Sequence, residues 1–300
     1  MRGIDENEGH RRQSPLSPHS TRMELKSFDN PTHYQNEVFA FLAANEAQYC
    51  LPLGLIDTMI HKPETYPKAY LWALYERDRI AGAAWMMPPH PIGLTVMPED
   101  GIAALVGEAS RIPDTPRSVL GPKQQSDSFR DRWTAVRGVS VKTTMEQRIY
   151  KATEIRQPFV VEGAMRLVEE RDLPLLEGWN LRFSRDCGDE DDPQQAREYA
   201  VAGIANRTRY LWMVGGEAVS MAGASGPTPS GIRINWVYTP DLLRGRGFAS
   251  ALVATLSRKL LSEGRQFCFL YTDLANPTSN NIYQKIGYVA VCDSAQHTFE

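Results

Sequence analysis

The residues best suited to chemistry lie at positions 244–249, where two arginines alternate with two glycines. Glycine has no Cβ, so the backbone amides of Gly245 and Gly247 can approach a ligand closely, and the arginines add positive charge beside them. A helix that begins here would present unsatisfied N–H groups in its first turn. This combination is suited to a phosphate or another anion. Two glycines in an ordinary turn at a helix start remain the alternative.

The spacing of these glycines separates the site from the common nucleotide-binding loops. It matches neither the G-x-x-x-x-G-K-[ST] loop nor the G-x-G-x-x-G loop. Nucleoside triphosphates and dinucleotides are therefore disfavoured as ligands.

The flanking sequence predicts the two elements that would position the loop. Residues 234–239 are β-branched and aromatic and end at Pro240, which predicts a strand. After the loop, leucines and other apolar residues recur at every fourth position as far as Gly264, which predicts a helix with one buried face. The repeating positions are Phe248, Leu252, Leu256 and Leu260.

A second group of polar residues follows the next predicted strand. Residues 267–271 form a continuous apolar run, which is typical of a buried parallel strand. Residues 276–288 then contain Asn276, Ser279 and Tyr283 at intervals of three and four residues.

Together the two segments resemble motifs of the GNAT acyltransferase superfamily. Residues 244–249 satisfy each fixed position of its pyrophosphate loop, [QR]-x-x-G-x-[GA], and residues 276–288 resemble its later N-x-x-[AS]-x-x-x-Y-x-x-x-G-[FY] element. The resemblance covers roughly residues 160–300. It implies an α/β fold in which a mixed, mostly antiparallel sheet is flanked by helices. It also implies transfer of an acetyl (acyl) group from acetyl-CoA to a primary amine of a small molecule.

The resemblance also assigns the cofactor-binding residues. The backbone before the loop would bind the pantetheine, the loop amides the pyrophosphate, Arg244 or Arg246 the ribose phosphate, and two polar residues the thioester end. The full set is Val237, Tyr238, Thr239, Arg244, Gly245, Arg246, Gly247, Phe248, Ala249, Asn276 and Ser279. A non-catalytic module that senses acyl-CoA is the alternative function.

Tyr283 is the candidate general acid, because a phenol can protonate a thiolate leaving group within hydrogen-bond reach. A tyrosine packed on the sheet is the alternative reading of this residue. The general base is less defined: some superfamily members carry a glutamate on the strand before the loop, where this chain has Asn235. Asp273 is the nearest candidate carboxylate, and a water chain or an amine that arrives neutral would serve as well.

An earlier part of the chain repeats the pattern of the second half. Residues 69–75 and 80–85 predict a hairpin, and residues 210–214 and 218–224 have the same order and spacing. We interpret this as a tandem duplication, with a coincidence of hairpin patterns as the alternative. The first copy has Glu99-Asp100-Gly101 where the second has its loop, and two carboxylates at a helix start would repel a pyrophosphate.

The predicted organisation is therefore a disordered tail over residues 1–22, a degenerate GNAT-like domain over 23–157 and a catalytic domain over 158–300, with the boundary near Pro158. The acidic stretch at 185–192 is expected either to be solvated or to attract a cationic amine.

Composition limits the remaining classes. A net charge of −3 argues against a dominant nucleic-acid surface, and no apolar run is long enough to predict a membrane helix. The four cysteines show no paired spacing, which favours reduced thiols, no structural metal and a cytoplasmic location. A monomer or homodimer that acts on a small-molecule amine is expected.

Overall fold

The structure is a computed structural model that describes residues 23–156, 160–188 and 192–300. The predicted tail over residues 1–22 and the predicted boundary at Pro158 lie outside the described residues. In the described part of the chain, every helix is too short or too polar to cross a membrane.

The same order of elements occurs twice: a strand, two helices, three strands, a helix, a strand, a helix and a long strand. The first half contains β1 (Met23–Phe28), α1 (Pro31–Ala43), α2 (Cys50–His61), β2 (Tyr70–Glu76), β3 (Arg79–Met86), β4 (Ile92–Leu94), α3 (Glu99–Ala109), β5 (Ser118–Pro122), α4 (Lys123–Arg137) and β6 (Val141–Ala152). The second half contains β7 (Ala164–Leu167), α5 (Leu173–Cys187), α6 (Pro193–Ala205), β8 (Arg209–Val214), β9 (Glu217–Ser225), β10 (Gly231–Tyr238), α7 (Phe248–Ser262), β11 (Phe267–Asp273), α8 (Pro277–Lys285) and β12 (Val289–Phe299). The order of elements thus agrees with the repeat seen in the sequence.

The strands form one continuous sheet, in the order β1-β2-β3-β4-β5-β12-β6-β11-β10-β9-β8-β7. Its described pairs are antiparallel except for β4 with β5 and β10 with β11. The predicted fold class, a mixed and mostly antiparallel sheet flanked by helices, is confirmed. The sheet runs through both halves without interruption.

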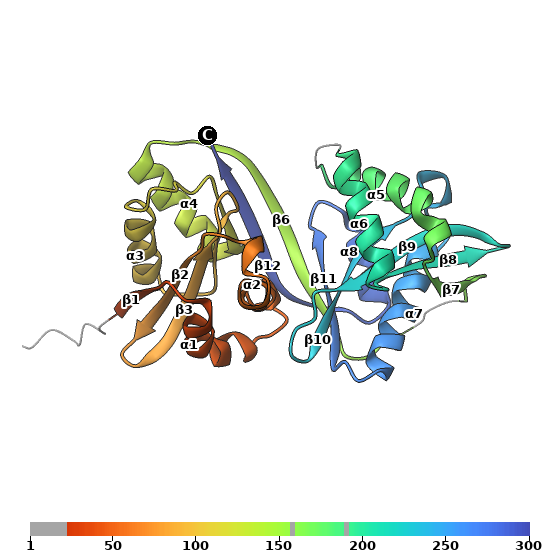
Figure 1. Cartoon of the computed structure of the whole chain (residues 1–300), viewed down its shortest axis with the longest axis horizontal. Coiled ribbons are helices and arrows are strands. Elements are labelled where there is room, and N and C mark those ends of the chain that lie inside the picture. Colours follow the sequence, from red (N-terminus) through yellow and green to blue (C-terminus); the bar gives the residue numbers. More distant parts are fainter. Residues whose placement is uncertain (1–22, 157–159, 189–191) are drawn as a thin grey trace, which may run out of the picture.

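The two halves exchange their last strands. β6 leaves the first half and pairs with β11, where Tyr150 lies opposite Leu270. β12 returns from the second half and pairs with β5, where Gln296 lies opposite Leu120. The exchanged strands also pair with each other and run side by side across the middle of the molecule (Figure 1). Each half is therefore completed by a strand from the other.

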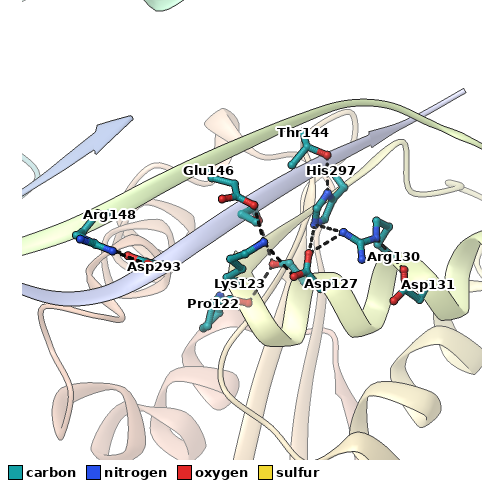
Figure 2. A network of polar contacts seen from close by, with 12 residues as sticks. Pro122, Lys123, Asp127, Arg130, Asp131, Thr144, Glu146, Arg148, Asp293 and His297 are labelled. Carbon is teal, nitrogen blue, oxygen red and sulfur yellow. Dashed lines mark hydrogen bonds and ion pairs between the residues drawn. The ribbon is translucent and has the colours of Figure 1, made fainter. Parts of the chain in front are cut away.

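A polar network joins the exchanged strands to α4 (Figure 2). On neighbouring strands, Arg148 donates two hydrogen bonds to Asp293, at 2.6 and 2.9 Å. The side chain of His297 is fully buried, and its Nε2 lies 2.8 Å from Oδ1 of Asp127 on α4. The network spans segments that are far apart in the sequence, so it ties the two halves together.

Helices cover both faces of the sheet in each half. In the second half, α5 and α6 pack on one face and α7 and α8 on the other. The predicted apolar stripe of α7 is buried at Phe248, Leu252, Leu256 and Leu260, as expected for a helix that packs on a sheet.

α2 was not predicted from the sequence. Pro52 and Gly54 both disfavour helix by propensity. Proline is tolerated in a first turn, however, and burial of Leu53, Ile56 and Met59 against the sheet outweighs local preference.

Candidate active site

β10 and β11 separate along their length. The two parallel strands pair only between residues 231–233 and 267–269, although β10 continues to Tyr238 and β11 to Asp273. The facing edges of both strands beyond Arg233 are therefore not bonded to each other. This wedge leaves backbone groups available to an extended ligand, as an added strand would use them.

A bulge in β10 accompanies the separation. Asn235 and Tyr238 pair with Gly223 and Met221 on β9, so β10 holds one extra residue between these pairs. Trp236 in the bulge has φ +54°, a conformation that is uncommon for a residue other than glycine. Bulges often lie beside active sites because they redirect side chains.

The predicted anion loop adopts a conformation that requires its glycines. Gly245 has φ +78° and Gly247 has φ +82°, and Gly247 directly precedes α7. No side chain caps the helix. In the described part of the chain, the amides of residues 245–250 have no hydrogen-bond partner, and a Cβ on Gly245 would meet open space. The site therefore offers bare N–H groups at a helix start, a fitting cradle for a pyrophosphate.

The two arginines of the loop differ in their contacts. The Nε of Arg244 donates to the carbonyl oxygen of Thr239 at 2.9 Å. Its Nη2 lies 2.5 Å from Asp186 and 2.9 Å from Asp241. Arg246 is exposed and forms no ion pair with any described residue. Arg244 therefore orders the loop, while Arg246 is available to a phosphate.

The acidic stretch before α6 contributes structural contacts where it is described. Asp186 pairs with Arg244, and Asp192 caps α6 by accepting from the amide of Gln195 at 3.0 Å. Residues 189–191 lie outside the described residues.

The polar residues of the second motif lie at the start of α8. Oδ1 of Asn276 accepts from the amide of Ser279 at 3.0 Å and so caps the helix. Asp273 ends β11, is exposed, and accepts from the amide of Ala275 at 2.8 Å. Its carboxylate thus closes a turn, and this contact would compete with a role as general base.

Tyr283 lies inside the second half. Its side chain is buried, and its ring centre lies 6.4 Å from that of Tyr150 and 6.0 Å from that of Tyr288. Both neighbouring hydroxyls are hydrogen-bonded, whereas that of Tyr283 has no partner within the described ranges. Burial, followed by the proximity of Cys187, raises the pKa of Tyr283 above its ordinary value. The phenol therefore stays protonated and can donate.

The first half contacts both strands that flank the wedge. Glu46 accepts hydrogen bonds from the amides of Ser230 and Gly231, at 2.7 and 2.9 Å, just before β10 pairs with β11. At the start of α2, the sulfur of Cys50 lies 3.0 Å from the hydroxyl of Tyr271. Cys50 of the first half thus borders the candidate site, and the expectation that the first half packs against the site or shapes the substrate side stays a prediction.

The corresponding position in the first half carries no comparable cradle. α3 begins with Glu99 and Asp100, and Glu99 is hydrogen-bonded to Ser128 at 2.5 Å and to Arg132 at 3.0 Å. Gly101 is packed so closely on Leu74 that a Cβ would come within 2.2 Å of it. The carboxylates at this helix start agree with the expected loss of the anion site.

Two arginines near the wedge were absent from the prediction. Arg209 at the start of β8 is buried, and Arg233 is the last residue of β10 that pairs with β11. The alternation of Arg233 with Ile232 and Ile234 was a signal in the sequence that it lies on the opposite face from the α7 core. Nothing local signals the burial of Arg209.

Solved structures with a similar fold support the resemblance to the GNAT superfamily. An acetyltransferase of the GNAT family from Colwellia psychrerythraea has a TM-score of 0.59 at 12% identity, over 92% of this chain and 100% of that chain. A GCN5-related N-acetyltransferase from Sphaerobacter thermophilus has a TM-score of 0.61 at 15% identity, over 92% and 94%. A tandem GNAT protein from the clavulanic acid biosynthesis pathway has a TM-score of 0.54 at 10% identity, over 92% and 97%.

The chain therefore has the fold of the GNAT superfamily, and the resemblance carried by the two motifs is confirmed at that level. Residues 213–296, which include the loop and the second motif, match the model of a family described as FR47-like protein. No curated protein matches the sequence.

Proposed function

We propose that this protein is an N-acetyltransferase that transfers an acetyl (acyl) group from acetyl-CoA to a primary amine of a small molecule, within a ternary complex. The observation that carries this proposal is the row of unpaired amides at residues 245–250 beside the wedge between β10 and β11. A diphosphate fits the amides, and an extended pantetheine fits the unpaired edge of β10.

The binding residues follow from these contacts. The backbone of Val237, Tyr238 and Thr239 would hold the pantetheine, and the amides from Gly245 through Ala249 would hold the diphosphate. Arg246 is better placed than Arg244 for a phosphate, because Arg244 is already bonded to Asp186 and Asp241. The N-terminus of α8, at Asn276 and Ser279, would lie near the thioester end.

Acetyl-CoA supplies the acyl group as a thioester, whose C–S bond breaks as the amine nitrogen forms the new C–N bond. The electron pair of the broken bond goes to sulfur, which takes a proton from the phenol of Tyr283. The attacking amine loses its proton to water or to Asp273, and water returns a proton to the phenolate of Tyr283. Most of the acceleration would come from holding the amine and the thioester in line.

The first half serves in this proposal as a partner without a cofactor site of its own. Glu99 and Asp100 stand at the start of α3, where the second half has its loop. The segment 23–157 would thus shape the acceptor side through Cys50, and the segment 158–300 would carry the chemistry.

A non-catalytic acyl-CoA sensor is a second candidate, favoured by one observation. Asn235 stands where some superfamily members carry a glutamate, and Asp273 is engaged in a turn. Neither of these two described positions thus offers a carboxylate that is free of other contacts. A sensor would need no base.

Two measurements on the same preparation separate these functions. Calorimetric titration with acetyl-CoA measures binding, and release of free thiol across a panel of amines measures transfer. The enzyme proposal predicts both binding and amine-dependent release of thiol. Binding with no release above background for any amine would support the sensor, and absence of binding would reject both.

A further inference from the structure

Arg209 occupies an unusual position for a charged side chain. It is 4% exposed, and its guanidinium carbon lies 4.2 Å from the centre of the Trp236 ring. Gly223, on β9, lies between two neighbours: it is opposite Arg209 of β8 on one side and opposite Asn235 of β10 on the other. A Cβ on Gly223 would come within 2.2 Å of Nη1 of Arg209. The missing side chain of Gly223 therefore lets Arg209 extend across the sheet to Asn235.

No carboxylate of the described residues balances the charge of Arg209. Its nearest oxygen partner is Oδ1 of Asn235, to which Nη1 donates at 3.4 Å. The Nε atoms of Arg209 and Arg233 are both buried without a hydrogen-bond partner. In the described ranges neither arginine forms an ion pair, and burial and then the charge of Arg233 lower the pKa of Arg209 to about 9. Arg209 remains positive at neutral pH.

Two half-buried arginines, Arg166 in the second half and Arg148 at its border, do have carboxylate partners. Arg166 donates two hydrogen bonds to Asp172, and Arg148 donates two to Asp293. A buried cation without a partner is strongly unfavourable, and two neighbouring ones repel each other. Within the described ranges, no anion compensates the charges of Arg209 and Arg233.

The pair lies where an acceptor would meet the acyl group. Arg233 is the last residue of β10 that pairs with β11, and Asn235 is two residues further along the opened strand. Arg233 is also close to Cys50 of the first half. Burial raises the pKa of the Cys50 thiol, and the positive charge of Arg233 partly opposes that rise. The pair therefore stands at the apex of the wedge, on the face of the sheet that α5 and α6 cover.

Aromatic side chains adjoin the same position. The Trp236 ring has its centre 5.1 Å from that of Phe183 on α5 and 5.1 Å from that of Tyr199 on α6. Trp236 is half-buried and Tyr199 is exposed, so this aromatic group reaches the surface. An apolar portion of a ligand could pack there while an anionic group meets the arginines.

We propose that Arg209 and Arg233 bind a carboxylate of the acceptor, so that the acceptor is an amino acid or another amine with a carboxylate close to its amino group. The planar guanidinium fork suits a carboxylate, which it can bind through two parallel hydrogen bonds. This inference rests on the proposed acetyl transfer. It disfavours polyamines, whose charge the pair would repel.

Matched acceptors test the carboxylate directly. Amino acids are compared with their amides and with the amines that lack the carboxyl group, with thiol release as the readout. The expected kcat/KM is at least about tenfold higher for the amino acids, and Arg209→Met or Arg233→Met removes that preference. Arg117→Met, which removes an exposed charge in the first half, is the control and should retain the preference.

A second arm assigns the carboxylate to the acceptor or to the acyl group. Succinyl-CoA with neutral amines is compared with acetyl-CoA with amino acids. Acetylation of amino acids and amides at equal kcat/KM would overturn the inference while leaving acetyl transfer intact. Preference for succinyl-CoA with neutral amines would also overturn it, because the carboxylate would then belong to the acyl group.

Thermal unfolding separates a binding role from a structural one. Amino acids should raise the Tm of the wild-type protein but not that of Arg209→Met, and without ligand Arg209→Met should be at least as stable as the wild type, because an unpaired buried charge is gone. Two results together would reject the subsite. The Tm of Arg209→Met would be much lower than that of the wild type, and amides would stabilise Arg209→Lys as much as amino acids do. Stabilisation by amino acids without any thiol release would retain the subsite and reject acetyl transfer.

Discussion

At the scale of single residues, Tyr283 combines burial with a hydroxyl that has no partner among the described residues. Burial raises the pKa of Tyr283, so its phenol keeps its proton at neutral pH. We expect Tyr283→Phe to leave acetyl-CoA binding unchanged and to lower kcat on the order of 100-fold, the usual contribution of a positioned general acid. Single-turnover thiol release and calorimetric titration measure the two effects.

Tyr288→Phe is the matched control for this change. Tyr288 is equally buried, but its hydroxyl lies 2.7 Å from that of Ser257, so its loss should lower stability by about 1 kcal/mol and spare kcat. Wild-type kcat in Tyr283→Phe would show that the thiolate obtains its proton elsewhere.

Candidate residues could be selected from the sequence where they stand at a characteristic local spacing. Gly245, Gly247 and Tyr283 stand at fixed intervals within short motifs, so the sequence identified them and the structure supplies their surroundings. Arg209 is different, because its importance follows from the missing side chain of Gly223 and from an absent carboxylate. The lack of a carboxylate beside Arg209 in the folded protein produces no pattern in the amino-acid sequence.

At the scale of elements, the contact between β12 and α4 should make stability depend on pH. His297 is fully buried against Asp127, and burial, followed by the charge of Arg130, lowers its pKa below the usual 6.5. The unfolded chain then binds a proton that the folded chain does not, so stability decreases as the pH falls below 6.5 towards the folded pKa. Urea unfolding between about pH 8 and pH 5 measures this loss.

Substitution identifies His297 as the source. His297→Gln should unfold with a weaker dependence on pH over this window, whereas the exposed His61→Gln should behave like the wild type. The lowered pKa values of Asp127 and Asp293 act below this range, because carboxylates lose their stabilising charge only as the pH approaches 3.8 and lower. Equal pH dependence in His297→Gln and the wild type would contradict this account.

Strands and helices with a clear apolar period were predictable, but their partners were not. The apolar stripe of α7 follows from local pattern, and the helix occurs with that stripe buried. The pairing of β12 with β5 joins residues more than half the chain apart, and the same sequence could equally have paired within its own half. Partner choice depends on the whole assembly of strands.

At the scale of the whole molecule, the strand exchange makes the halves depend on each other. Residues 23–157 alone would lack β12, and residues 158–300 alone would lack β6. We expect each segment by itself to unfold without cooperativity, since an exposed sheet edge and an uncovered core remain. Co-expressed segments should form a one-to-one complex with a single unfolding transition, measured by size-exclusion chromatography and circular dichroism.

Stable, monomeric folding of both isolated segments would contradict the exchange. The complex of the two segments should also regain acetyl-CoA binding, because the wedge lies beside β6. Binding by the second segment alone would show that β6 is dispensable for the site.

The bare amides at the start of α7 are proposed to hold the diphosphate of acetyl-CoA. Calorimetric titration of acetyl-CoA into Gly247→Val and Gly264→Val tests this proposal most directly. Both glycines have positive φ, so both changes strain the backbone by about 1–2 kcal/mol, but only Gly247 lies in the loop. We predict a loss of affinity of at least about tenfold for Gly247→Val and wild-type affinity for Gly264→Val; equal affinity in both variants would contradict the account.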